Sequence, residues 1–430
     1  MISENAQVGL DFGTTTTLLT YTNSDLDLTK VVPLSFQTVG RDWLPSLAAY
    51  VDGRIIVGPE AERAPYWARI SSAKRHITLG HESVVLVDDD GIEFEVNLDE
   101  VIVEILRYVV EVALSQGIDL RQRAVRLGCP SSWNGSQRSK LIDCAQLAGI
   151  TNANIDDVRD EPVAAGLQYF EYLRRNGQEH RGNVLVFDMG GGTLDVALLR
   201  INVRLERSEV FVLASDGNSF AGDAFDEEFA KLISSQLLLS DENELPEAVF
   251  EYLSKEIVEP FKKTLELQGR YNPKLAEKFS HRTPSGDVEL TENQLVQALS
   301  PIMEKAKVLI DRTLREAKLI HEDGASHGSV SGLKSEDLFS EIDTVFLVGG
   351  MTQLQSMRRF LREWFPGKEI LSQTNLQSER DSNIYKPEES VGLGLAAFRE
   401  PDGLNLFRPP FDINLEWIDR RGENHVVRLY

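Results

Sequence analysis

Residues 184–195 have the sequence VLVFDMGGGTLD, which indicates a buried strand, a glycine turn and a second strand. Four apolar residues lead into Asp188, as expected for a strand covered on both faces. The three glycines let the backbone approach a ligand closely, and their N–H groups can point at an anion. Asp188 and Asp195 supply oxygens suited to hydrated Mg²⁺, and Thr193 adds a hydroxyl. The pattern predicts a site for a polyphosphate and its metal; the alternative is an ordinary glycine-rich hairpin.

The same device occurs near the N-terminus, where residues 8–18 have the sequence VGLDFGTTTTL. A short apolar strand again runs into an aspartate, Asp11, and Gly13, Thr14 and Thr15 occupy the turn. Two copies so far apart in one chain predict two related lobes. Each lobe would offer one hairpin to the same phosphate chain.

The composition is that of an ordinary soluble globular protein, with 42% hydrophobic and 26% charged residues in 430. A net charge of −23 argues against a general surface for nucleic acid or anionic membranes. Cys129 and Cys144 lie among apolar neighbours and are expected to be buried thiols, not a disulfide framework. Neither a membrane-spanning apolar run nor a signal-peptide layout is present, so a cytoplasmic location is expected.

Other segments carry clear local signals. Apolar residues at helical spacing predict a helix over residues 99–115, and Thr291 with Gln294 predicts a capping box. Asp52-Gly53 between two apolar runs predicts a tight hairpin. Residues 321–334 are rich in glycine, serine and histidine and are expected to form an exposed loop.

Three further features bear on the site. Residues 73–80 are expected to follow a helix, and Lys74 among them is either a phosphate partner or a solvated surface lysine. Glu161, next to Pro162, either caps a helix or points into a cleft to orient a water. Residues 344–350 form a third strand that runs into glycines, Gly349 and Gly350, and a helix is expected to begin there.

Taken in order, these motifs resemble the ATPase domain of the 70-kDa heat-shock chaperones of the DnaK type, within the actin–hexokinase superfamily. The resemblance covers roughly residues 7–398. It rests on seven ordered motifs: residues 11–15, residues 73–75, Pro130, Glu161-Pro162, residues 188–195, residues 222–226 and Gly349-Gly350.

The resemblance implies an α/β, bilobal actin-like ATPase fold, in which each lobe has a mixed sheet flanked by helices around a central nucleotide cleft. Lobe I is expected over residues 1–182, with a smaller subdomain at about 38–98. Lobe II is expected over 183–400, with a smaller helical subdomain at about 216–330. Residues 401–430 would form a linker, a possible β-hairpin or a private extension, without room for the family's peptide-binding β-domain and lid.

The resemblance also implies ATP or ADP with Mg²⁺ as ligands. Asp11 and Asp188 would hold the metal through water, and Lys74, Glu161, Asp188 and Thr193 would be the catalytic residues. The remaining nucleotide contacts would come from Gly13, Thr14, Thr15, Gly190, Gly191, Gly192, Thr193, Gly222, Asp223, Glu259, Lys262, Lys263, Glu266, Gly349, Gly350, Met351, Gln353 and Glu388.

Pro130 and Arg138 resemble the family's relay between the nucleotide state and the interdomain linker. Several positions on the base side depart from the family's pattern. Gln353 and Lys263 stand where arginines are usual, Met351 replaces a small polar residue, and Glu266 lies near a usual serine. These changes alter the contacts expected with adenine, whereas the phosphate side keeps the family's residues.

The resemblance implies a slow ATPase, chaperone-like, whose nucleotide state moves the lobes and controls a partner or the C-terminal segment. Its partners would be nucleotide and a protein client or co-chaperone, with no nucleic acid and no membrane span; the oligomeric state stays open. The alternatives are a nucleotide-sensing scaffold with little turnover, an actin-like filament protein and a small-molecule kinase.

Overall fold

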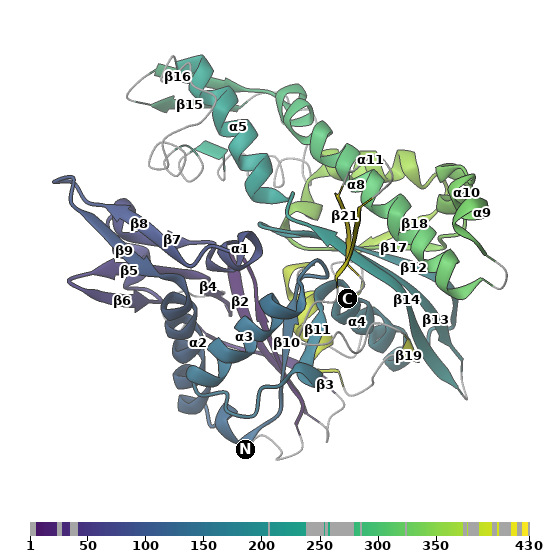
Figure 1. The fold of residues 1–430 in the computed structure, drawn as a ribbon, viewed down its shortest axis with the longest axis horizontal. Helices are drawn as coiled ribbons and strands as arrows, with labels where there is room; N and C mark the ends of the chain where they lie inside the picture. The colour runs from purple at the N-terminus through teal and green to yellow at the C-terminus, as the bar shows by residue number, and fades with distance from the viewer. Residues whose placement is uncertain are drawn as a thin grey trace.

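A computed structural model gives the fold of the chain (Figure 1). It describes residues 6–23, 28–34, 42–204, 207–237, 253, 257–258, 279–283, 286–322, 325–372, 376, 387–397, 402–403, 414–418 and 424–428.

The first sheet is built around the N-terminal hairpin. Strand β1 (Val8–Phe12) pairs antiparallel with β2 (Thr16–Asn23), which pairs in turn with β3 (Leu28–Val32) and β4 (Leu44–Pro45). On its other side β1 pairs in parallel with β10 (Val125–Cys129), and β10 pairs in parallel with β11 (Val158–Asp160). Strand β1 is buried along its whole length, which explains its continuous apolar character. We call the part of the molecule built on this sheet lobe I.

The second sheet repeats this plan. Strand β12 (His180–Met189) pairs antiparallel with β13 (Leu194–Val203), which pairs with β14 (Ser208–Asn218). On the other side β12 pairs in parallel with β17 (Thr344–Val348), and β17 with β18 (Glu369–Ser372). The order β3-β2-β1-β10-β11 therefore matches β14-β13-β12-β17-β18. The predicted internal repeat is confirmed, and we call the part built on this sheet lobe II.

Lobe I carries a smaller region of hairpins and helices (Figure 1). Strands β5 (Leu47–Val51), β6 (Arg54–Val57) and β7 (Arg69–Ser71) form one sheet, and β8 (Ser83–Val87) pairs with β9 (Glu93–Asn97). Asp52 and Gly53, with φ of 50° and 74°, close the predicted tight hairpin. The helices of this lobe are α1 (Ala73–Leu79), α2 (Leu98–Ser115) and α3 (Gly135–Leu147). Cys129 and Cys144 are buried as expected, and burial raises the pKa of each thiol to about 12.

The described helices of lobe II lie after β14 in the chain, interspersed with the strands β17 and β18. They are α5 (Gly222–Leu237), α8 (Glu292–His321), α9 (His327–Ser331), α10 (Ser335–Ser340) and α11 (Gln355–Trp364); strands β15 (Phe279–Thr283) and β16 (Gly286–Leu290) form a hairpin. The predicted capping box of Thr291 and Gln294 starts α8.

Two sequence expectations in this lobe are wrong in part. Residues 321–334 are not wholly a loop, because Ser326 and Ser329 cap each other and start the short helix α9. The third glycine pair does not open a helix directly: a 3₁₀ turn, η7 (Gly350–Gln353), comes first, and α11 begins at Gln355. At α9 the serine side chains close a short helical turn, and at η7 the backbone does so. The amino-acid composition indicates neither turn.

Two helices join the lobes by crossing between them. Helix α4 (Glu161–Arg175) follows β11 of lobe I but packs on β12, β13 and β14 of lobe II, and nearly all of its residues are buried. Helix α12 (Ser390–Leu395) comes after β18 of lobe II in the chain, packs on α4, and covers β1, β2 and β10 of lobe I. A Cβ on Gly394 would lie 1.7 Å from the carbonyl oxygen of Ala164, so this close crossing requires glycine.

The C-terminal part contains β19 (Asp402–Gly403) and the predicted hairpin, β20 (Asn414–Ile418) with β21 (Asn424–Arg428). Strand β19 joins the lobe II sheet as the neighbour of β14. No helix in the described part of the chain is long and apolar enough to cross a membrane. The domain boundaries given above from the sequence stay predictions.

Candidate functional site

The two glycine turns have the same backbone closure. In lobe I the N–H of Gly13 donates to the carbonyl oxygen of Thr16 at 2.9 Å, and in lobe II Gly190 donates to Thr193 at 3.2 Å. Each aspartate is the last residue but one of its strand, just before the turn, and both Asp11 and Asp188 are buried. The repeat thus extends from the sheet order to single hydrogen bonds.

The turns face one another across the lobes. A Cβ added to Gly191 would lie 2.5 Å from Oγ1 of Thr15, and one on Gly192 would lie 2.5 Å from Oγ1 of Thr14. Residues more than 170 positions apart in the chain therefore form one surface of hydroxyls and backbone. The structure brings together the two turns that the sequence singled out.

Lys74 and Glu161 form a buried ion pair beside these turns. Lys74 lies in the first turn of α1 with its side chain 2% exposed, and its Nζ donates to Oε1 of Glu161, the first residue of α4. Burial lowers the pKa of Lys74, but Glu161 and Asp11 more than offset this, so the pKa lies above its ordinary value. The surface-lysine interpretation of Lys74 is therefore wrong, because the ammonium group is enclosed and paired.

Three buried aspartates share this site. Burial, followed by repulsion from Glu161, raises the pKa of Asp11 to about 7 and that of Asp195 to about 8. The pKa of Asp188 is raised well above its ordinary value by burial and then by Glu161, Asp195 and Asp11. In the described part of the chain, the carboxyl groups of these three aspartates and Glu161 thus interact with the ammonium group of Lys74, an arrangement that favours an additional cation.

Lobe II extends its turn into helix α5. The N–H groups of Gly222 and Asp223 donate to the carbonyl oxygens of Gly190 (3.1 Å) and Gly191 (2.6 Å), which fixes the turn against the start of the helix. The carboxylate of Asp223 also reaches back across the lobes, with Oδ2 at 3.9 Å from Nη1 of Arg75 on α1. Gly222 and Asp223, which the resemblance predicts as nucleotide contacts, therefore lie beside the glycine turn of lobe II.

The third glycine element lies beside the lobe II turn. Gly349 has φ of +82°, and a Cβ there would lie 2.4 Å from the carbonyl oxygen of Met189. Met351 is buried, and Nε2 of Gln353 donates to Oε2 of Glu388 at 3.2 Å. The structure thus places Gly349 against Met189 and brings Gln353 to Glu388. Four other predicted contacts, Glu259, Lys262, Lys263 and Glu266, lie outside the described residues.

Pro130 and Arg138 lie behind the site in lobe I. Arg138 is 3% exposed, donates from Nη2 to Oδ1 of Asp160 at 2.6 Å and from Nε to the carbonyl oxygen of Trp133 at 3.1 Å. Nη2 also lies 3.4 Å from the carbonyl oxygen of Pro130. Because Asp160 directly precedes Glu161, this buried pair fixes the backbone that carries the carboxylate beside Lys74.

The structure adds a contact between the lobes that the sequence did not reveal. The N–H of Ser131 in lobe I donates to Oδ1 of Asp195 in lobe II at 2.7 Å, and the hydroxyls of Ser131 and Ser215 lie 2.6 Å apart. The serines stand in unremarkable local sequence, so only the pairing of the lobes brings them together. The sequence indicates that Asp195 can supply oxygens to hydrated Mg²⁺, but it does not indicate that Asp195 links the two lobes.

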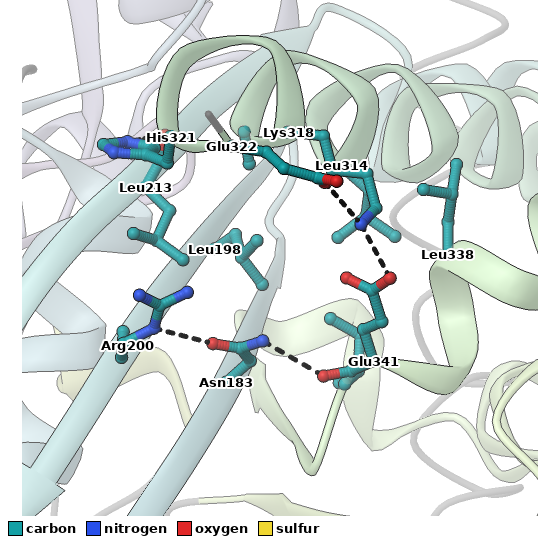
Figure 2. A pocket seen from close by; sticks show the side chains of 12 residues that line it. Asn183, Leu198, Arg200, Leu213, Leu314, Lys318, His321, Glu322, Leu338 and Glu341 are labelled. Atoms are coloured by element: carbon teal, nitrogen blue, oxygen red, sulfur yellow. Dashed lines mark hydrogen bonds and ion pairs between the residues drawn. The ribbon is translucent and has the colours of Figure 1, made fainter. Parts of the chain in front are cut away.

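A separate pocket of about 200 Å³ lies beneath the C-terminal end of α8 in lobe II (Figure 2). The floor of the pocket is aliphatic. The charged side chains at its rim form ion pairs with one another: Nζ of Lys318 lies 2.8 Å from Glu341 and 3.1 Å from Glu322. Asn183 bridges Arg200 and the carbonyl oxygen of Glu341 (Figure 2). None of the predicted site residues lines this pocket.

Among the described residues, no three histidine, cysteine or acidic side chains converge as direct ligands of one metal ion. Mg²⁺ keeps several waters and is commonly held by one or two carboxylates together with phosphate oxygens. The buried cluster of Asp11, Asp188, Asp195 and Glu161 therefore fits a hydrated Mg²⁺ bound with a phosphate chain.

Comparison with known proteins agrees with this geometry. A family model described as "Hsp70 protein" matches residues 7–379. The chaperone protein DnaK of Thermosipho melanesiensis is 28% identical over 398 residues, which are 90% of this chain and 58% of that protein. The DnaK proteins of Mycoplasmoides gallisepticum and Thermotoga maritima are each 27% identical and cover 90% of this chain; the matches span 59% and 58% of their own lengths.

The chain thus spans somewhat more than half the length of these relatives. The matched region begins just before β1 and ends past β18, so it contains both hairpin turns and every strand of the two sheets except β19. The repeated sheet order, the paired turns and the family match lead to one conclusion: the chain belongs to the Hsp70 family and has its bilobal, actin-like ATPase fold.

Proposed function

We propose that this chain binds Mg-ATP between its two hairpin turns, hydrolyses it slowly, and uses its nucleotide state to move the lobes and control a partner or its own C-terminal segment. The observation that carries the proposal is the convergence of Asp11, Asp188 and the Lys74–Glu161 pair at the facing turns. The relatives named chaperone protein DnaK support a chaperone role for the whole protein.

In this proposal the turns hold the phosphates and the aspartates hold the metal. The hydroxyls of Thr14, Thr15 and Thr193 and the N–H groups of residues 190–192 would bind phosphate oxygens. Asp11 and Asp188 would hold Mg²⁺ through water, and the ion would supply charge neutralisation at the phosphates. The raised pKa values support this assignment, because a cation among these carboxylates would favour their ionised forms.

Lys74 and Glu161 would act on the water that attacks the terminal phosphate. The ammonium group of Lys74 would neutralise charge that develops on the phosphate, and Glu161 would orient the water. Their mutual ion pair fixes both side chains without help from solvent, since both are buried. Catalysis would thus come mainly from positioning and electrostatics.

Gly349, Gly350, Met351, Gln353 and Glu388 would lie on the adenosine side. The positive φ of Gly349 lets the chain turn closely against Met189. The hydrogen bond from Gln353 to Glu388 presents an amide and a carboxylate where the resemblance leads one to expect an arginine. This difference, with the buried Met351, favours a nucleotide sensor with little turnover as the second candidate function.

Control of the C-terminal segment is supported by two contacts between parts of the molecule. Residues Asp402 and Gly403 pair with Phe211 and Val212 at the edge of the lobe II sheet. Ser131, directly after Pro130, contacts Asp195 in lobe II. A change at the phosphates could therefore reach the edge strand through the relative positions of the lobes.

The test is single-turnover hydrolysis of labelled ATP with Mg²⁺ by the wild type and Lys74→Ala. We expect Lys74→Ala to retain nucleotide binding and to lose at least about 100-fold in rate. Lys140→Ala is the matched control, because Lys140 forms a more exposed ion pair, 2.8 Å from Asp99, on α3. Binding without turnover in every variant would favour the sensor. Equal rates for Lys74→Ala and wild type would contradict the role of Lys74.

A further inference from the structure

The pocket beneath the C-terminal end of α8 has an apolar floor built by several elements of lobe II. The floor residues come from β13, β14, α8, α10 and the residues just after α10, and all are buried: Leu198, Leu213, Leu314, Ala317, Leu338 and Ile342. An apolar cavity of about 150 Å³ is large enough to bind benzene. The pocket, at about 200 Å³, therefore has room for an aliphatic group of about six to eight non-hydrogen atoms.

The wall that α10 contributes to the pocket is held on α8 by hydrogen bonds. Arg315 of α8 donates from Nη1 to the carbonyl oxygen of Val330 at 2.5 Å and from Nη2 to that of Leu333 at 3.0 Å. Asp311, one turn earlier on α8, lies 2.6 Å from Nε of Arg315 and accepts from Oγ of Ser335 at 2.7 Å. These contacts fix the start of α10 against α8, so the pocket is largely formed before any ligand enters.

Most polar groups at the rim already have partners within the protein. Nε2 of His321 lies 3.0 Å from the carbonyl oxygen of Leu213, and the ammonium group of Lys318 pairs with both Glu322 and Glu341. Figure 2 shows these side chains around the aliphatic floor. A cationic ligand would have to compete with Lys318 for the two carboxylates.

Arg200, on β13, differs from the other charged groups of the rim. Its Nε donates to Oδ1 of Asn183 at 3.4 Å, a long contact with a neutral group, and within the described residues its guanidinium group forms no ion pair. Figure 2 shows Arg200 on the side of the pocket opposite the pair of Lys318 and Glu341. The planar fork of a guanidinium group matches the two oxygens of a carboxylate. The rim thus presents a suitable cation next to the aliphatic floor.

We propose that this pocket binds an aliphatic carboxylate. The carboxylate would pair with the guanidinium group of Arg200, and the aliphatic group would lie on Leu198 and Leu213. A free short-chain carboxylic acid and the aliphatic C-terminal residue of a peptide share this chemistry. The proposal is independent of the nucleotide function, because none of the predicted nucleotide contacts lines the pocket.

The experiment is titration of the full chain with hexanoate, hexan-1-ol and hexylamine, followed by NMR of the leucine methyl groups. We expect hexanoate to shift the signals of Leu198 and Leu213, with a dissociation constant on the order of 1 mM. Arg200→Gln should weaken the binding of hexanoate at least about fivefold and leave the weaker binding of hexan-1-ol unchanged. Arg362→Gln, at an exposed arginine of α11 that does not line the pocket, is the matched control and should bind hexanoate like wild type.

A second variant tests the pocket itself. Ala317→Leu keeps a good helix former on α8 and fills part of the cavity, so it should abolish the shifts caused by hexanoate and by hexan-1-ol. N-acetyl-leucine and its amide then distinguish the two sources of the ligand. Binding of N-acetyl-leucine that is tighter than that of hexanoate and is lost in the amide would indicate the end of a peptide. Tighter binding of hexanoate would indicate a free acid.

Three results would overturn the proposal. The first is a wild type in which hexanoate leaves the methyl signals of Leu198 and Leu213 unchanged. The second is equal affinity of Arg200→Gln and wild type for hexanoate, and the third is binding of hexylamine as tight as that of hexanoate. Each of these results would leave the proposed hydrolysis of ATP untouched, because the titrations contain no nucleotide.

Discussion

The two hairpins of the molecule share a scaffold and differ in chemistry. Both carry a buried aspartate one residue before the end of the first strand, and both close the turn with one equivalent hydrogen bond. The residue paired with that aspartate differs: Leu18 lies opposite Asp11, and Asp195 lies opposite Asp188. Lobe II therefore places a second carboxylate in its own hairpin, while lobe I brings its additional charges, Lys74 and Glu161, from helices.

This difference teaches how a repeated fold acquires an asymmetric site. The sheet order and the turns are duplicated, so the binding of phosphate and metal would be shared between the lobes. The groups proposed to act on water lie at the starts of α1 and α4, outside the repeated hairpins. The predictions below test this division.

The largest effect is expected from Glu161→Gln. If lobe I supplies the groups that act on water, single-turnover hydrolysis should fall about 10³-fold. Affinity for Mg-ATP should change only a few-fold, because the turns and aspartates remain. A loss of affinity that matches the loss in rate would show that the division between binding and chemistry is wrong.

The next largest effect is expected on stability. Loss of a buried ion pair in lobe I should lower the free energy of unfolding more than loss of an exposed ion pair in lobe II. Arg138 and Asp160 lie 2.6 Å apart and are 4% and 2% exposed, whereas Arg312 and Asp216 lie 2.5 Å apart and are 60% and 20% exposed. Arg138→Met should lower the free energy of unfolding by about 3 kcal/mol, since it removes the guanidinium group that pairs with the buried carboxylate of Asp160. Arg312→Met should cost less than about 1 kcal/mol. Denaturant unfolding of both variants measures the contrast, and equal losses would contradict it.

A smaller effect should appear in the pH dependence of stability without nucleotide or Mg²⁺. The pKa of Asp11 is raised from 3.8 to about 7, so the folded protein binds a proton that the unfolded chain releases. Stability from this group is therefore greatest at low pH and is lost as pH rises through about 7. Asp11→Asn should raise the free energy of unfolding at pH 8 relative to pH 5 by on the order of 2 kcal/mol.

Asp89→Asn is the matched control for this prediction, because Asp89 is exposed and lies far from the hairpin turns in the chain. It should leave the difference between pH 5 and pH 8 unchanged. Equal changes in the free energy of unfolding at both pH values in Asp11→Asn would contradict the prediction. They would show that burial and the neighbouring carboxylate do not raise the pKa of Asp11 in the folded protein.

Much of the fold follows from local patterns in the sequence. The apolar runs into Asp11 and Asp188, the repeated glycine turns and the capping box of Thr291 and Gln294 each reflect short-range physics, and the structure confirms them. The repeat of the sheet could be inferred because the same motif occurs twice. Residues 321–334 were harder, since one pair of mutually capping serines is enough to start the helix α9.

The site could be predicted only where a motif carries it. Lys74 alone has the character of a surface lysine, and its burial depends on Glu161, 87 positions away. Ser131 and Ser215 stand in sequence that gives no sign of their contact between distant segments. Such contacts depend on how the lobes and crossing helices pack, which no local pattern encodes.

The most direct test of the central claim is a double-mutant cycle between the two hairpins. ATP affinity with and without Mg²⁺ should be measured for wild type, Asp11→Asn, Asp188→Asn and the double variant. If both hairpins hold one metal-bound nucleotide, each single variant should lose most of the Mg²⁺-dependent gain in affinity, and the double variant should lose little more. Losses that simply add, or an unchanged Mg²⁺ dependence in either single variant, would contradict a site shared by the two lobes.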